Sequence, residues 1–238
     1  MKRTHSLLSM MIIALILSGC AAQIPGWRVH NQQAFVLLNE KKFDEAITEY
    51  SKAIALYPTA PFLYSSRGRA YRLKRDNINA IADFTKALEI EPNAFEVYFE
   101  RGNLLAAGMQ FDKAIDDYTE AIGKNPDSRY YLNRGLIYML QEKYDPAKAD
   151  FEKVIDDAPR THVAYYNLGL IHTYQGNLDK AVEELSQAIK FNKEYVDAFV
   201  ARGDAYLKLG KTDLSKYDYQ KACDLGRLDI CDELKQKP

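Results

Sequence analysis

Arginines and aspartates recur at a fixed spacing in this sequence. Four arginines that each precede a glycine are followed sixteen residues later by an aspartate: Arg67 and Asp83, Arg101 and Asp117, Arg134 and Asp150, Arg202 and Asp218. At two further positions of the same series, Gln33 and Leu168 stand in place of the arginine. Each is followed sixteen residues later by a glutamate, Glu49 and Glu184. A planar guanidinium matches a carboxylate in a two-bond pair. Because each arginine has its own acid, we interpret the series as structural ion pairs. A row of arginines that binds an anionic ligand is the weaker alternative.

No group of residues has the spacing of a catalytic or cofactor site. His30, His162 and His172 are scattered along the chain, and the sequence contains neither a nucleophile-elbow motif nor a glycine-rich phosphate loop. His172 takes a position that is aromatic elsewhere in the series, so we interpret it as a packed core residue. We therefore predict no catalytic residues, no metal and no cofactor. An enzyme or a small-ligand-binding protein is the least favoured function.

The charge balance argues against a nucleic-acid partner. The chain has 32 lysines and arginines against 33 acidic residues, a formal net charge of −1. Its 17 tyrosines suggest base stacking, but they fall at the spacing of buried positions. A surface that binds phosphates needs an excess of positive charge, which is missing here.

The residues described above belong to a unit that repeats along the chain. Its clearest marker is a glycine that returns after 34, 33, 34 and 34 residues: Gly68, Gly102, Gly135, Gly169 and Gly203. Within each unit, small and apolar residues recur at helical spacing on both sides of a turn signal such as Arg75-Asp76-Asn77. The pattern predicts two short antiparallel helices in each unit, which bury their apolar faces against neighbouring units.

This period, with its order of small, aromatic and proline positions, resembles the tetratricopeptide repeat (TPR). The resemblance begins near residue 27 and implies an all-α fold. We expect a right-handed α-α superhelix, or TPR solenoid, of about six helix-turn-helix repeats over residues 28–226. A capping helix and tail are expected over residues 227–238. The repeats are expected at about 27–60, 61–94, 95–127, 128–161, 162–195 and 196–226.

The first residues have the pattern of a signal peptide, expected over residues 1–19. Lys2 and Arg3 precede an apolar run from Leu7 to Leu17, which is too short to span a bilayer as a helix. The following Leu17-Ser18-Gly19-Cys20 resembles a bacterial lipobox. The resemblance implies cleavage before Cys20 and attachment of acyl chains to its sulfur. An ordinary secretory signal with an incidental cysteine is the alternative.

A lipidated Cys20 would place the protein on a membrane of the bacterial envelope. Residues 20–27 would form a short tether between the lipid and the first helix. Ala21, where some lipoproteins carry aspartate, resembles lipoproteins that are sorted to the outer membrane and face the periplasm. The inner membrane stays open, because this sorting rule differs among bacteria.

Cys223 and Cys231 lie close together near the C-terminus, on either side of Gly226, which can end one helix before the next begins. Their spacing resembles that of the disulfide-bonded cysteines in Sel1-like repeats. The resemblance implies a disulfide that fastens the capping helix. Two reduced, buried cysteines are the alternative.

In TPR proteins the first helix of each repeat lines a concave groove that binds a peptide, and these positions can be carried over to this chain. The expected groove residues are Arg69, Arg72, Phe99, Asn103, Asn133, Leu136, Tyr166, Asn167 and Leu170. Met139, Thr173, Asp204 and Leu207 take similar positions. An apolar middle with arginines toward one end suits an amphipathic segment that has an acidic end. Alternatively, several of these side chains pack between repeats.

The resemblance therefore implies a membrane-anchored TPR adaptor or scaffold that binds a protein or peptide segment in the groove. Its role would be the assembly or regulation of a cell-envelope complex. A pilotin-like lipoprotein that assists assembly of a type IV pilus secretin is the alternative, because six repeats after a lipobox resemble that class. The sequence leaves the partner and the oligomeric state open.

Overall fold

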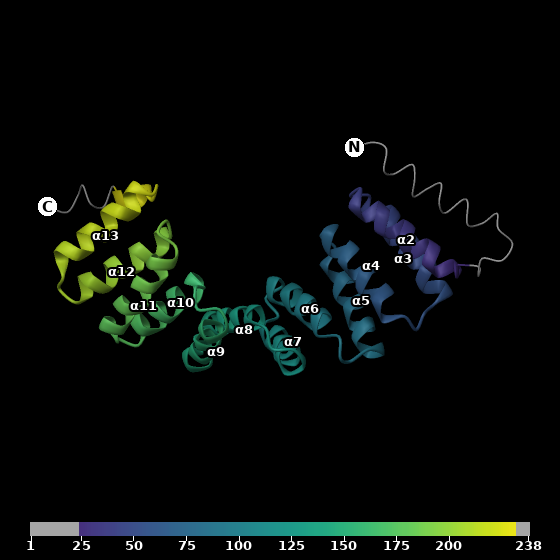
Figure 1. Ribbon diagram of the computed structural model, residues 1–238, viewed down its shortest axis with the longest axis horizontal. Helices are drawn as coiled ribbons and strands as arrows, with labels where there is room; N and C mark the ends of the chain where they lie inside the picture. The colour runs from purple at the N-terminus through teal and green to yellow at the C-terminus, as the bar shows by residue number, and fades with distance from the viewer. Residues whose placement is uncertain (1–23, 232–238) are drawn as a thin grey trace. The chain divides into compact units, whose positions relative to one another are not determined.

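The computed structural model describes residues 24–231, and within that range it contains helices and turns but no strand (Figure 1). Cys20, the expected signal peptide over residues 1–19 and residues 232–238 lie outside the described range. The chain divides into two compact parts, an N-terminal unit (Met1–Asn93) and a C-terminal unit (Ala94–Pro238).

The N-terminal unit contains two helical hairpins. Its helices are α2 (Gly26–Asn39), α3 (Phe43–Leu56), α4 (Pro61–Leu73) and α5 (Asn77–Ile90). Helices α2 and α3 pair, α4 and α5 pair, and α3 packs on α4. Helix α2 begins at Gly26, so the end of the range expected as tether is already helical. The Trp27 ring packs 5.3 Å from that of Tyr57 and 5.5 Å from that of Phe62, measured between centroids.

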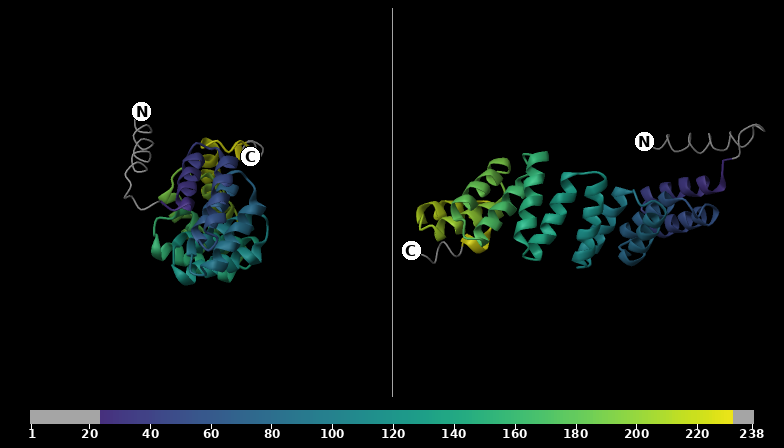
Figure 2. Two further views of the ribbon diagram at one scale, coloured as in Figure 1. Left: turned by 90° about the vertical axis from the view of Figure 1, so that its right-hand side faces the viewer. Right: turned by 90° about the horizontal axis from the view of Figure 1, so that it is seen from below.

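The C-terminal unit contains four further hairpins. Its helices are α6 (Phe95–Ala107), α7 (Phe111–Lys124), α8 (Ser128–Leu140), α9 (Tyr144–Asp157), α10 (His162–Tyr174), α11 (Leu178–Phe191), α12 (Val196–Lys208) and α13 (Thr212–Asp224). Each even-numbered helix pairs with the odd-numbered helix that follows it, and these are called the first and second helices of a repeat below (Figure 2). First helices of neighbouring repeats also meet, α6 with α8 and α10 with α12. Residues 228–231 are helical, within the expected capping segment.

Within each unit, the core lies between successive hairpins as well as inside each hairpin. One buried cluster joins the second helix of one repeat to the first helix of the next: Ala147, Phe151 and Val154 on α9 with Ala164, Leu168 and Ile171 on α10. Such contacts between neighbours are the means by which a repeat protein builds a hydrophobic core.

Every hairpin turns through one residue with positive φ, placed two residues after the first helix ends. In the first four repeats these are not glycines: Lys41, Arg75, Met109 and Glu142 have φ between 58° and 68°. The last two repeats have Gly176 and Gly210 there, with φ of 77° and 72°. The left-handed conformation is thus imposed by the packing of the helices even where the residue does not favour it.

The recurring glycine lets the two helices of a repeat approach closely. A Cβ atom added to Gly135 would lie 2.9 Å from the Cε1 atom of Phe151, which is completely buried. Gly135→Ala is therefore expected to lower the free energy of unfolding by about 1–3 kcal/mol, as overpacking does. Gly123→Ala on α7 is the matched control, because nothing lies within 4 Å of its added Cβ. The free energy of unfolding of the control should rise by about 0.5–1 kcal/mol, because alanine favours the helix more than glycine does.

Thermal or urea unfolding of the two glycine variants measures this difference. If Gly135→Ala were as stable as Gly123→Ala, close packing against Phe151 would not be the reason for the glycine.

Candidate functional site

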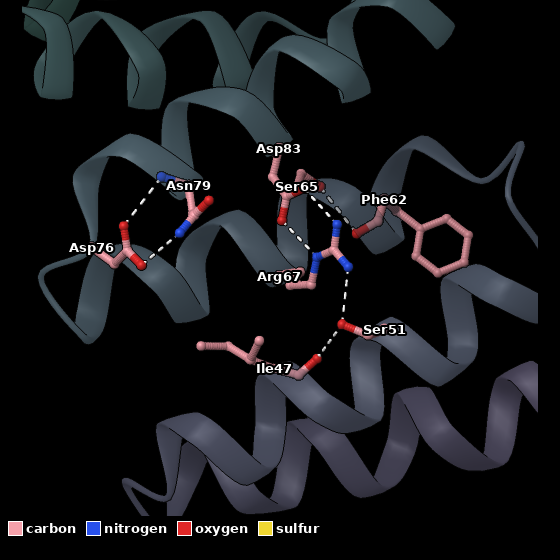
Figure 3. A network of polar contacts seen from close by, with 8 residues as sticks. All are labelled: Ile47, Ser51, Phe62, Ser65, Arg67, Asp76, Asn79 and Asp83. Atoms are coloured by element: carbon pink, nitrogen blue, oxygen red, sulfur yellow. Dashed lines mark hydrogen bonds and ion pairs between the residues drawn. The ribbon is translucent and has the colours of Figure 1, made fainter.

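The four predicted arginine–aspartate pairs come together in the structure, and each joins the first helix of a repeat to the second. In the N-terminal unit, Arg67 donates from Nε to Asp83 Oδ2 and from Nη2 to Asp83 Oδ1, both at 2.8 Å (Figure 3). The pairs of Arg101, Arg134 and Arg202 have the same arrangement at 2.7–2.9 Å. The four aspartates are only 1–6% exposed. These pairs therefore join the two helices within each of the four repeats.

Arginines of this series also reach the preceding repeat. Arg67 Nη1 donates to Ser51 Oγ at 2.9 Å, and Ser51 Oγ donates to the carbonyl oxygen of Ile47 (Figure 3). Arg134 bonds Thr119 and Arg202 bonds Ser186 in the same way. Sequence reasoning missed this contact. The available signal was a hydroxyl residue fifteen or sixteen positions before the arginine.

Two hollows open between first helices of the C-terminal unit. The first, of about 590 Å³, lies between α8 and α10 and is lined by Leu136, Met139, Leu140, Glu142, Tyr144, Asn167 and Tyr174. The second, of about 260 Å³, lies between α10 and α12 and is lined by Leu170, Thr173, Tyr174, Ala201, Asp204, Leu207 and Lys208. Both linings are mainly apolar with a few polar groups, which is the usual character of a binding hollow.

Tyr174, at the end of α10, borders both hollows. Its side chain is 63% exposed, and its ring stacks on that of Tyr144 with centroids 5.5 Å apart. Leu140 and Leu207 are exposed beside it. A group of exposed aromatic and aliphatic side chains around a hollow is a surface that a protein partner can bury. We call the two hollows together the Tyr174 surface.

Sequence reasoning identified part of this surface. Leu136, Asn167 and the similar position Met139 line the first hollow. Leu170 lines the second, together with the similar positions Thr173, Asp204 and Leu207. Leu140, Tyr144 and Tyr174 were missed. The signal that could have found two of them is their shared position, since Leu140 and Tyr174 each follow the repeat glycine by five residues.

Other expected groove residues are engaged within the C-terminal unit. The Phe99 ring packs between those of Tyr118 and Tyr130, at 6.0 and 4.7 Å. Asn103 Oδ1 accepts hydrogen bonds from the Tyr118 hydroxyl at 2.9 Å and from Asn133 Nδ2 at 2.8 Å. Burial raises the pKa of Tyr118 to about 12, so it remains a donor to Asn103. These side chains link neighbouring first helices.

The expected residues Tyr166 and Asn167 also make internal contacts. The Tyr166 ring lies 5.0 Å from that of Tyr195, and burial raises the pKa of Tyr166. Asn167 is 6% exposed, and its Nδ2 donates to the carbonyl oxygen of Val163 at 2.7 Å. Asn167 thus presents only a small part of its surface to the first hollow.

Arg69 and Arg72, the expected cationic end of the groove, lie on α4 of the N-terminal unit. Arg69 is half-buried, and its charge acts on Tyr50, whose pKa is raised by burial. Arg72 is exposed in the last turn of α4. Both hollows of the Tyr174 surface belong to the other unit.

Cys223 and Cys231 form a disulfide, with Cα atoms 5.1 Å apart. It ties the end of α13 to the helical segment 228–231. Arg227, which lies between the two cysteines, donates from Nη1 to Asp197 Oδ1 on α12 at 2.7 Å. This contact also joins the C-terminal segment to α12.

Among residues 24–231, no group of histidine, cysteine, aspartate or glutamate side chains is arranged to hold a metal ion. Over the same range, no helix has the length and apolar character needed to cross a membrane.

Family models of the tetratricopeptide repeat match most of the described chain. Models described as "Tetratricopeptide repeat" match residues 27–60, 65–129, 99–160 and 196–225, and a model described as "TPR repeat" matches residues 169–210. Human tetratricopeptide repeat protein 13 is 31% identical over 81 residues. That match covers 34% of this chain but 9% of the human protein, so the chain spans a small part of that relative.

Two solved structures show the same fold at low identity. YrrB, described as a TPR protein with an unusual peptide-binding site, has a TM-score of 0.69 and 18% identity, covering 79% of this chain and 97% of its own. PilW, described as a widely conserved type IV pilus biogenesis factor, has a TM-score of 0.64 and 16% identity, covering 82% of this chain and 91% of its own. With its paired helices and matching repeat models, the chain belongs to the tetratricopeptide repeat family.

Proposed function

We propose that this protein is a lipid-anchored adaptor of the bacterial cell envelope that binds a segment of a partner protein at the Tyr174 surface. The observation that carries the proposal is the exposure of Tyr174 between two mainly apolar hollows. An extended or helical segment could place apolar side chains in both hollows and cover the tyrosine ring. Protein binding is the general role of the repeat family, and the printed description of YrrB includes a peptide-binding site.

The membrane anchor is a separate part of the proposal, and its support is the lipobox-like Leu17-Ser18-Gly19-Cys20. Acyl chains on Cys20 would hold the repeats at a membrane surface, and the outer membrane facing the periplasm is the proposed location. An adaptor there would bring its partner to a cell-envelope complex.

A pilotin-like role in type IV pilus assembly is the second candidate. It is favoured by the number of repeats that follow the lipobox-like sequence and by the likeness to PilW, which at 16% identity concerns the fold alone. Crosslinking in intact cells, followed by purification from membranes, separates the two roles. Secretin subunits are the partner expected of a pilotin, and cell-wall hydrolases or synthases are those expected of an adaptor.

Tyr174→Ala is expected to weaken binding of the captured partner by about tenfold or more, because truncating an aromatic hot-spot residue costs about 2 kcal/mol or more. Tyr217→Ala on α13 is the matched control, since Tyr217 is 57% exposed and lies outside both hollows. Titration of purified partner into each variant measures the affinity. Equal losses in the two variants would remove the Tyr174 surface from the proposal.

A further inference from the structure

A third hollow in the C-terminal unit lies between second helices, whereas the Tyr174 surface lies between first helices. It has a volume of about 360 Å³ and opens between the second helices α9 and α11, beside α10. Its lining includes Leu168, which stands where four other repeats carry the paired arginine. The neighbouring repeats show what normally fills this position.

In the repeats on either side, an arginine links two second helices. Arg134 donates to Thr119 on α7 and to Asp150 on α9. Arg202 donates to Ser186 on α11 and to Asp218 on α13. Each guanidinium also lies over two rings of its own helix, three residues before and four residues after the arginine. These are Tyr131 and Tyr138 for Arg134, and Phe199 and Tyr206 for Arg202, at 5.8–5.9 Å.

The fifth repeat keeps a partner at each corresponding position but lacks the arginine. Glu184 takes the place of the aspartate, and Glu152 takes the place of the hydroxyl residue sixteen positions before Leu168. Tyr165 and His172 take the places of the two rings. All four line the hollow. A leucine side chain has no polar group that could bond these carboxylates, so the fifth repeat lacks the intrachain guanidinium of its neighbours.

Two groups in this hollow lack the partners that their counterparts have. His172 is 5% exposed, and its Nδ1 has no hydrogen-bond partner in the described part of the chain. Glu184 likewise makes no hydrogen bond or ion pair within residues 24–231. Burial and the nearby charges of Glu183 and Glu152 raise the pKa of Glu184. Glu184 is half-buried, and a cation beside it would offset the partial desolvation of its carboxylate.

The first repeat shows that a missing arginine need not leave an unpaired acid. There Gln33 replaces the arginine, but Glu49 bonds His30 Nδ1 and Lys52 Nζ, both at 2.6 Å. The fifth repeat has no such replacement. Lys148 Nζ lies 3.8 Å from Glu152 Oε1, and Lys180 also lines the hollow. Acidic residues still outnumber these lysines, because Asp156, Glu183 and Glu184 complete the lining.

We propose that the hollow of the fifth repeat binds the guanidinium group of an arginine side chain supplied by a partner protein. The carboxylates of Glu184 and Glu152 would accept its N–H groups, and the rings of Tyr165 and His172 would lie against its planar face. The bound side chain completes the link between α9 and α11 that an intrachain arginine makes in the neighbouring repeats.

The probe is a blocked Gly-Gly-Arg-Gly-Gly peptide, titrated into the full chain while the His172 imidazole is followed by NMR. We expect a saturable shift with the arginine peptide and at least tenfold weaker binding of the same peptide with lysine. Glu184→Gln should weaken the arginine peptide about tenfold or more. Tyr174→Ala should leave its binding unchanged, which separates this site from the proposed partner surface.

A double variant, Leu168→Arg with Glu184→Asp, restores the residues of the other repeats. It should raise the melting temperature and abolish binding of the arginine peptide. Absence of a saturable shift in the wild-type chain would overturn the proposal, as would unchanged binding in either the double variant or Glu184→Gln. Equal affinity for the lysine peptide would exclude guanidinium recognition. Tighter binding of free L-arginine than of the peptide would exclude a partner protein as the source.

Discussion

Replacing Arg134 with alanine is expected to lower the free energy of unfolding by about 3 kcal/mol, the scale for breaking a buried ion pair. The substitution leaves Asp150, which is 4% exposed, without the two hydrogen bonds that it receives from the guanidinium. It also removes the bond to Thr119 on the preceding second helix. The main loss is therefore the link between α8 and α9, the two helices of the fourth repeat. Urea or thermal unfolding measures the loss.

Arg129→Ala is the matched control for burial. Arg129 bonds Asp127 at 2.8 Å, as close as the internal pairs, but its side chain is 66% exposed. Exposed pairs contribute about 0–1 kcal/mol. A variant with apolar residues at both positions, Arg134→Met with Asp150→Leu, should recover part of the loss, because no buried charge then remains unpaired. Equal losses in Arg134→Ala and Arg129→Ala would contradict a structural role for the pair.

Cys20→Ser is expected to move the protein from the membrane fraction to the soluble fraction almost completely. The expected acyl chains contribute about 0.8 kcal/mol for each buried methylene, and two or more chains give stable anchoring. Serine has no thiol to which the lipid could be attached. Fractionation of cells, with mass spectrometry of the mature N-terminus, measures both the location and the attached lipid.

Cys223→Ser is the control for the loss of a thiol. It breaks the disulfide with Cys231 but leaves Cys20 unchanged, so the variant should stay in the membrane fraction. A wild-type protein that is fully soluble, with an unmodified sulfur at Cys20, would exclude the lipid anchor.

The paired helices could be predicted because the same physical requirements recur in every repeat. Gly135 is a glycine because Phe151 leaves no room for a Cβ, and a glycine returns for the same reason in neighbouring repeats. The arginine–aspartate pairs could be predicted because a spacing of sixteen residues carries both groups from one helix to the next. Their third partner, such as Ser51, belongs to a different repeat and was therefore overlooked.

The Tyr174 surface was harder to predict because repeat position alone does not say whether a side chain is exposed. Asn103 and Leu170 each follow the repeat glycine by one residue, yet Asn103 bonds Tyr118 and Asn133 whereas Leu170 lines a hollow. Tyr118 and Asn133, which bond Asn103, correspond by repeat position to Leu185 and Ala201, whose side chains offer Leu170 no polar group. Likewise, the absence of arginine at Leu168 was visible in the sequence, but the unpaired Nδ1 of His172 becomes apparent only when α9, α10 and α11 are packed together.

Site-specific photo-crosslinking tests the proposed partner surface most directly. A benzophenone amino acid is placed at position 174, or at position 217 as the control, and the cells are irradiated. If the Tyr174 surface holds the partner, a defined crosslinked product should form from position 174 and be nearly absent from position 217. A product that forms from position 217 but not from position 174, or equally from both, would contradict partner binding at this surface.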